Sequence, residues 1–152
     1  MKICIGGTFN LLHKGHKKLL EEAFKTAGKD GFVFIGLTKQ KMQDKKKKIR
    51  YYSEREKDLV KFLKKKSWLS KSKIIPILDK YGLAVDEDYD AIIVSPETYR
   101  IAREINSKRL SLGKKPLKII RIPFVLAEDG KPISSSRIEK GEINENGGLI
   151  RD

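Results

Sequence analysis

The sequence predicts an α/β fold, a single Rossmann-like domain in which a five-stranded parallel sheet carries helices on both faces. Its 152 residues match the usual size of one domain. Short apolar runs alternate along the chain with segments of helical period. Strands that alternate with helices are joined by crossovers, which makes the sheet parallel and covers both its faces. We therefore expect residues 1–152 to form one domain.

Five short runs rich in Ile, Leu and Val predict buried strands. Between the first two, five apolar residues recur at helical spacing and predict an amphipathic helix, which Gly28 can end. The strands are expected at residues 3–5, 32–37, 74–78, 91–94 and 117–122, and the helix stripe comprises Leu19, Leu20, Ala23, Phe24 and Ala27.

Two further helices are predicted from their start signals. Ser53 followed by Glu56 matches the capping box that opens many helices. Ser95 is a candidate N-cap, with Pro96 at the first helical position, and that helix should run to about Gly113.

Composition excludes several classes of protein. The longest apolar run, residues 32–37, is far shorter than the roughly 20 residues of a membrane span. Cys4 is the single cysteine, which excludes an intrachain disulfide and a cysteine-based zinc site. The first residues lack the features of a signal peptide, so we expect a cytoplasmic protein with no membrane partner. The tail at residues 141–152, rich in Asn and Gly, is expected to be loosely ordered.

Positive charge is concentrated in one segment. The formal net charge is +14, and residues 39–73 hold 15 basic and 4 acidic residues, a net of +11. Such a segment attracts nucleic acid, an anionic membrane surface or phosphate-rich small molecules, although the run Lys45 to Lys48 is also typical of a solvated loop. Charge alone therefore indicates a polyanion without choosing one, and the Lys64 to Lys66 run has no assigned function.

The turn after the first predicted strand carries the strongest functional pattern. Gly6 and Gly7 allow a tight turn with backbone N–H groups close to an anion, and Thr8 adds a hydroxyl donor. The segment has neither a Walker ending nor a dinucleotide fingerprint. It reads Gly6-Gly7-Thr8-Phe9-Asn10-Leu11-Leu12-His13-Lys14-Gly15-His16.

Both histidines of the chain lie in this segment. His13 and His16 are three residues apart, so both rings can face one side of a helix. Gly15 between them leaves the backbone bare for the approach of a flat ring or a sugar. A zinc site is the alternative, but no third ligand lies within a helical turn, since Glu21 is five residues beyond His16.

This segment resembles the signature of the His-x-Gly-His nucleotidyltransferases. Residues 133–138, Ile-Ser-Ser-Ser-Arg-Ile, are similar to the ISSTxxR element of the same superfamily, about 120 residues further along the chain. Within it, residues 7–17, 94–100 and 129–138 resemble the phosphopantetheine adenylyltransferases of the archaeal and eukaryotic type. The stretch at 95–100, Ser-Pro-Glu-Thr-Tyr-Arg, is the most diagnostic.

The resemblance implies an enzyme of coenzyme A biosynthesis that transfers the adenylyl group of ATP to 4'-phosphopantetheine. The products are dephospho-coenzyme A and pyrophosphate. A phosphate acceptor is already ionised at neutral pH, so in-line attack needs neither a general base nor a covalent intermediate. The alternatives are another nucleotidyltransferase, acting on FMN, NMN or an alcohol phosphate, and a basic nucleic-acid-binding protein. We expect small-molecule substrates rather than nucleic acid.

The resemblance also implies roles for individual residues. Lys41 is preferred over Lys39 as the phosphate-binding lysine after the second strand. Mg²⁺ is expected with ATP, held mainly by the substrate phosphates. Nothing in the sequence specifies the oligomeric state or feedback by coenzyme A. The implied catalytic residues are His16, His13, Thr8 and Lys41; the ATP-binding residues are Gly6, Gly7, Thr8, Phe9, Gly15, His16, Arg100, Ser134, Ser135, Ser136 and Arg137; and the acceptor-binding residues are Thr8, Lys41 and Asn106.

Overall fold

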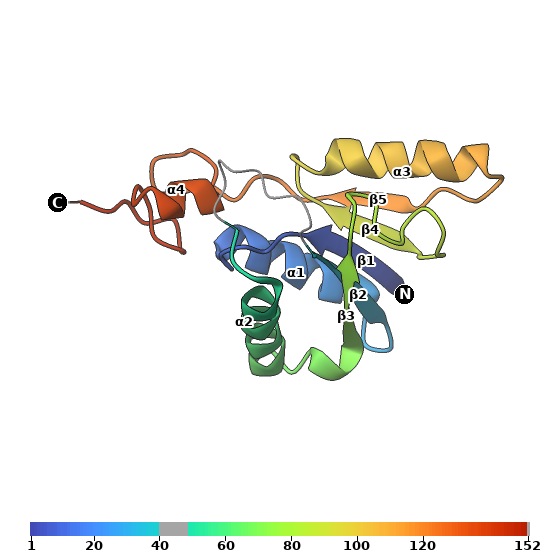
Figure 1. Ribbon diagram of the computed structural model, residues 1–152, viewed down its shortest axis with the longest axis horizontal. Coiled ribbons are helices and arrows are strands. Elements are labelled where there is room, and N and C mark those ends of the chain that lie inside the picture. The colour runs from blue at the N-terminus through green and yellow to red at the C-terminus, as the bar shows by residue number, and fades with distance from the viewer. Residues whose placement is uncertain (40–48, 152) are drawn as a thin grey trace.

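The computed structural model describes residues 1–39 and 49–151, and within them it contains one five-stranded parallel sheet (Figure 1). All five predicted strands are present, with shifted ends. The third strand starts and ends earlier than expected, and the fifth is shorter. The strands are β1 (Lys2–Gly7), β2 (Phe32–Thr38), β3 (Ser72–Ile77), β4 (Ala91–Val94) and β5 (Lys118–Arg121).

The strand order is β3-β2-β1-β4-β5. The chain starts in the middle of the sheet, builds outward through β2 to β3, and then returns to the other side of β1 for β4 and β5. This reversal places a topological switch point between β1 and β4, where ligands of open parallel sheets bind at the carboxyl ends of the strands.

Helices cover both faces of the sheet, as predicted (Figure 1). On one face, α1 (Lys14–Ala27) and α2 (Tyr52–Lys65) pack on Ile3 and Ile5 of β1 and their neighbours. On the other face, α3 (Tyr99–Ser111) packs with Cys4. The alternation of these three β1 residues between two hydrophobic clusters follows from the two-residue period of a strand.

The predicted starts of α2 and α3 are wrong. The amide of Arg55 donates to the Tyr51 carbonyl at 3.1 Å, which puts Ser53 inside the first turn of α2 instead of at its N-cap. Before α3, the amide of Ser95 donates to Thr98 Oγ1 at 3.0 Å. This bond closes a turn, and the helix begins only at Tyr99. The start of α2 is thus set by a backbone carbonyl, whereas α3 is preceded by a turn that the Thr98 side chain closes.

The segment after Gly141 is not the loose tail predicted from its composition. Ile143 is fully buried in a small cluster with Ala127 and Ile133. The amide of Lys14, at the start of α1, donates to the Glu145 carbonyl at 2.9 Å. One buried side chain and this backbone contact tie the C-terminal segment to the domain, next to α4 (Ser135–Glu139).

The remaining short element is the 3₁₀ helix η1 (Leu69–Lys71) between α2 and β3. The basic run that ends α2 has a structural explanation, because Lys64 and Lys65 lie in its last turn, where positive side chains complement the helix dipole. In the described part of the chain, no helix is long and apolar enough to cross a membrane.

Candidate functional site

A cavity of about 740 Å³ opens at the carboxyl ends of the strands. Its polar end is bordered by the loop after β1 and by residues 133–136, and its other end by the segment after β3 and the inner side of α3. The cavity therefore lies at the switch point between β1 and β4, where open parallel sheets bind their ligands.

Phe9 has a strained backbone at the centre of the first loop. Its φ of 46° lies in the left-handed region, which non-glycine residues rarely adopt, and its side chain is buried. The ring lies 5.1 Å from that of His16. A Cβ on Gly7 would lie 3.1 Å from the Phe9 ring, so this glycine makes room for the packed side chain of Phe9, which is itself part of the cavity lining.

His13 is the N-cap of α1. Its Nδ1 accepts from the amides of Gly15 at 3.0 Å and His16 at 3.4 Å. A Cβ on Gly15 would lie 2.8 Å from Cε1 of His13, so the glycine is required by the imidazole of its own motif, whatever ligand binds. The two neighbouring amides are also bonded: Lys14 donates to the Glu145 carbonyl and Lys17 to the His13 carbonyl. The first four amides of α1 therefore all have partners within the protein.

These bonds limit what the start of α1 can offer a ligand. Its first four amides are occupied by an imidazole and by carbonyls, so the helix can contribute only the positive end of its dipole.

The His16 side chain in turn accepts a hydrogen bond from the backbone of His13. Its Nδ1 accepts from the His13 amide at 3.3 Å, and the two rings stack with centroids 3.8 Å apart. Burial lowers the pKa of His13 to about 4. Burial, and secondarily the neighbouring His13, lower the pKa of His16 to about 3. Both rings are thus neutral at pH 7, and because each Nδ1 accepts a hydrogen bond, each proton resides on Nε2.

The serine segment lies beside this loop, although about 120 residues separate the two in the sequence. The Asn10 side-chain amide donates to Glu139 Oε1 at 2.8 Å, which ties the first loop to α4. Ser134 caps α4, since its Oγ accepts from the Arg137 amide at 3.2 Å. All three serines line the cavity. One serine therefore serves as a cap, and Ser135 and Ser136 offer hydroxyl groups to a ligand.

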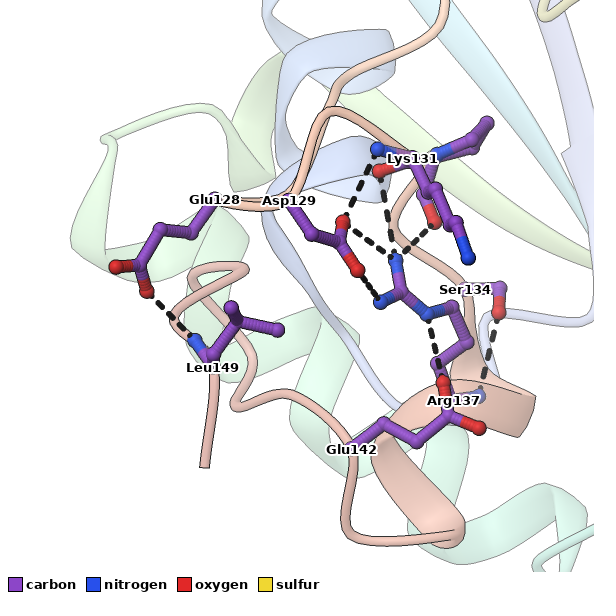
Figure 2. A network of polar contacts seen from close by, with 8 residues as sticks. Glu128, Asp129, Lys131, Ser134, Arg137, Glu142 and Leu149 are labelled. Atoms are coloured by element: carbon purple, nitrogen blue, oxygen red, sulfur yellow. Dashed lines mark hydrogen bonds and ion pairs between the residues drawn. The ribbon is translucent and has the colours of Figure 1, made fainter. Parts of the chain in front are cut away.

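Arg137 is held away from the cavity by a polar network, which Figure 2 shows. It forms ion pairs with Asp129 and, at 3.0 Å, with Glu142, and its Nη1 donates to the Pro132 carbonyl at 3.1 Å. The side chain is 15% exposed and is absent from the cavity lining. The structure thus does not place Arg137 on the phosphates, because two carboxylates already neutralise it.

Arg100 and Asn106 also lie outside the described cavity wall. The Arg100 side chain is 90% exposed and pairs with Glu104 at 3.6 Å. The Asn106 amide donates to the Leu117 carbonyl at 2.8 Å and accepts from its N–H at 2.7 Å. That pairing fastens α3 to the residue before β5 and holds the amide against the backbone, outside the cavity lining. Lys41 lies outside the described residues.

Sequence reasoning missed three parts of the site. Thr38 at the end of β2 lines the cavity, and Arg55 of α2 lies fully buried behind it. Thr38 directly follows an apolar run, which was the available signal, whereas nothing in the local sequence marks Arg55 as buried. The apolar end of the cavity was also missed; it includes Ile75, Ile77, Tyr81, Leu83, Ala84, Ile101 and Ile105.

A family model described as cytidylyltransferase-like matches residues 4–141. The chain belongs to this family. The match runs from β1 to just beyond α4, and therefore contains both segments that border the polar end of the cavity.

Relatives within the family resemble the chain over its whole length. A protein from Methanosarcina mazei named phosphopantetheine adenylyltransferase is 45% identical, over 99% of this chain and 98% of that protein. A protein of the same name from Archaeoglobus fulgidus is 40% identical, over 99% of this chain and 100% of its own length. A crystal structure of a protein of unknown function from Archaeoglobus fulgidus matches with a TM-score of 0.72 and 36% identity, over 80% of this chain and 89% of that one.

Proposed function

We propose that the protein transfers the adenylyl group of ATP to 4'-phosphopantetheine, which yields dephospho-coenzyme A and pyrophosphate. The observation that carries this proposal is the cavity, whose lining brings two phosphate-type segments together with a set of apolar side chains. Full-length relatives named phosphopantetheine adenylyltransferase support the choice of substrates. Both substrates are small molecules, and neither nucleic acid nor a membrane takes part in the proposed reaction, which we place in the cytoplasm.

In the proposed step, an oxygen of the acceptor phosphate attacks the α-phosphorus of ATP. The bond from that phosphorus to the oxygen bridging to the β-phosphorus breaks, and pyrophosphate leaves. The acceptor is already ionised at neutral pH, so no side chain has to remove a proton. Burial raises the pKa of the Cys4 thiol to about 12, so this cavity residue is protonated and does not compete as a nucleophile.

The protein's part is to position the phosphates and stabilise their charge. The Nε2–H groups of His13 and His16 are neutral donors at the polar end, and Thr8 adds a hydroxyl. Ser135 and Ser136 offer donors from the opposite border for the β- and γ-phosphates. The apolar end suits the uncharged arm of the acceptor, which is long and flexible. We therefore assign the nucleotide phosphates to the polar end and the acceptor arm to the apolar end.

Magnesium enters the proposal as part of the ATP substrate. The described residues contain no cluster of three or more His, Cys, Asp or Glu suited to a metal ion. Two carboxylates, Glu97 and Glu139, lie among the described residues of the cavity lining, and Glu139 already accepts from Asn10. This donor set fits an ion held mainly by phosphate oxygens and water, where it would neutralise negative charge.

Pyrophosphate release from ATP and magnesium tests the proposal, with 4'-phosphopantetheine, FMN and NMN offered separately. We expect release with 4'-phosphopantetheine alone, together with dephospho-coenzyme A. Release with a different acceptor would overturn the choice of substrate while keeping the reaction class. No release with any acceptor would overturn the enzymatic function.

A further inference from the structure

Behind the polar end of the cavity lies a buried arginine, Arg55, that pairs with no acidic side chain among the residues the structure describes. The Arg55 residue is 1% exposed. Its Nη2 donates to the Thr38 carbonyl at 2.8 Å, its Nη1 to the Thr8 carbonyl at 2.9 Å, and its Nε to the Arg50 carbonyl at 2.9 Å. Within the described part of the chain, its recorded hydrogen-bond acceptors are all carbonyl or hydroxyl oxygens. Among the described residues, dipoles therefore balance its positive charge, an arrangement that normally costs stability.

Arg55 also starts a chain of hydrogen bonds that ends at Thr8. Its Nη1 donates to Thr38 Oγ1 at 3.4 Å, and Thr38 Oγ1 donates to Thr8 Oγ1 at 3.2 Å. A guanidinium has only donors, so the Thr38 hydroxyl has to accept from it and has its hydrogen free for Thr8. Thr8 accepts that hydrogen, and its own hydroxyl hydrogen is therefore directed elsewhere.

Thr8 and Thr38 both line the cavity. Without Arg55, either hydroxyl could be the donor in the bond between Thr8 and Thr38, and Thr8 could donate its hydrogen to Thr38. We propose that Arg55 and Thr38 are positioning residues that orient the Thr8 hydroxyl as a donor to a phosphate oxygen. This role rests on the proposed function, which brings the phosphates of both substrates to this end of the cavity.

The hydroxyl of Thr38 is tested by a matched pair of variants. Thr38→Val keeps the shape of the side chain and removes the hydroxyl, whereas Thr38→Ser keeps the hydroxyl. We expect Thr38→Val to lower kcat/KM by about 10- to 100-fold, the usual effect of a hydrogen bond to a charged group, and to lower kcat more than it raises KM. Thr38→Ser should stay within about threefold of the wild type in the same assay.

Thr26→Val is the matched control, because this half-buried threonine of α1 is absent from the cavity lining, and we expect wild-type rates from it. Equal activity of Thr38→Val and the wild type would overturn the relay. So would an equal loss in Thr38→Ser and Thr38→Val, which would mean that packing rather than the hydroxyl matters.

The part played by Arg55 is tested by a double-mutant cycle. Arg55→Lys keeps the charge but cannot serve three separated acceptors with a planar fork. We expect it to lower kcat strongly in the wild-type background and only weakly beside Thr38→Val, because the relay is then already broken. If the losses of kcat in the two single variants simply add in the double variant, Arg55 only stabilises the loop and does not act through Thr38. Circular dichroism spectra establish that each variant is folded before its rate is compared.

Binding of inorganic pyrophosphate separates failure of this inference from failure of the proposed function. If the wild type releases no pyrophosphate with any acceptor, the proposed reaction is wrong, but calorimetric titration with pyrophosphate still reports on the anion site. Weaker binding by Thr38→Val than by Thr38→Ser would support the relay. Equal affinities, or no binding by the wild type, would overturn it.

Discussion

The two segments that border the polar end of the cavity differ in the partners that their polar side chains have within the protein. In the first loop, the His13 and His16 rings accept backbone hydrogen bonds through Nδ1, which leaves the proton of each neutral ring on Nε2. In the second, the charged residue Arg137 is already paired with Asp129 and Glu142. A charged residue inside a phosphate-type motif is therefore not by itself a ligand, because the network around it decides whether its charge is free.

The sharpest test of this contrast is His16→Ala. Loss of one preorganised donor to the transition state typically lowers kcat by about 100- to 1000-fold. Rates of pyrophosphate release measure the effect, and Lys18→Ala, an exposed lysine of the same helix, is the control. A near-normal rate in a folded His16→Ala variant would remove this residue from catalysis.

The neutral histidines also predict how stability depends on pH. Both folded pKa values, about 4 for His13 and about 3 for His16, lie below the unfolded value of 6.5. Below pH 6.5 the unfolded chain therefore binds more protons, and the free energy of unfolding falls as the pH decreases toward 4 and 3. Each histidine contributes a slope of at most about 1.4 kcal/mol per pH unit.

Urea unfolding between pH 4 and pH 7 measures this slope. His16→Gln, which cannot become charged, should lower the slope by the share of one histidine. An unchanged slope in that variant would mean that the His16 ring is not desolvated as the structure has it.

Ser135 and Ser134 are expected to have different roles, the first in ATP binding and the second in capping α4. Ser135→Ala should weaken ATP binding by about tenfold, the value of one hydrogen bond to a charged group. Ser134→Ala should instead lower the free energy of unfolding by about 1 kcal/mol, because it removes the cap of α4. Calorimetric ATP titration and urea unfolding of both variants distinguish the two roles. Equal ATP affinity of Ser135→Ala and the wild type would reduce the whole segment to a capping motif.

Arg137→Ala is expected to have the smallest effect on the reaction. Its ion pairs join Asp129 to Glu142, so its loss should lower the Tm while ATP affinity stays within about threefold. Asp129→Asn, which breaks the same network from the other side, should lower the Tm in a similar way. A large loss of ATP affinity in Arg137→Ala alone would show that the arginine leaves its carboxylates when ATP binds.

Local patterns predicted much of this molecule. The alternation of apolar runs and helical stripes predicted five parallel strands and the position of α1. These predictions succeeded because strand and helix periods depend on neighbours within one or two turns. The resemblance of two segments to motifs of one family implied that Gly7 and Ser135 belong to one site, and both line the same cavity.

Other features depended on groups distant in the sequence, and the sequence alone misassigned them. Asn106 pairs with the backbone of Leu117, 11 residues away. The Ser53 capping box, in contrast, failed for a local reason, because the Tyr51 carbonyl starts α2. The segment after Gly141 looked polar and loose, yet Ile143 is buried against residues contributed by the chain before α4.

The sequence by itself determined the order of the elements, the strands that meet at the site and the two segments that border it. Only the tertiary structure decided which polar side chains are free to act there. Burial keeps the His13 and His16 rings neutral, two carboxylates occupy Arg137, and Arg55 reaches Thr8 across 47 residues of chain. Charge state and hydrogen-bond direction depend on every group within a few ångströms, and the fold alone assembles those groups.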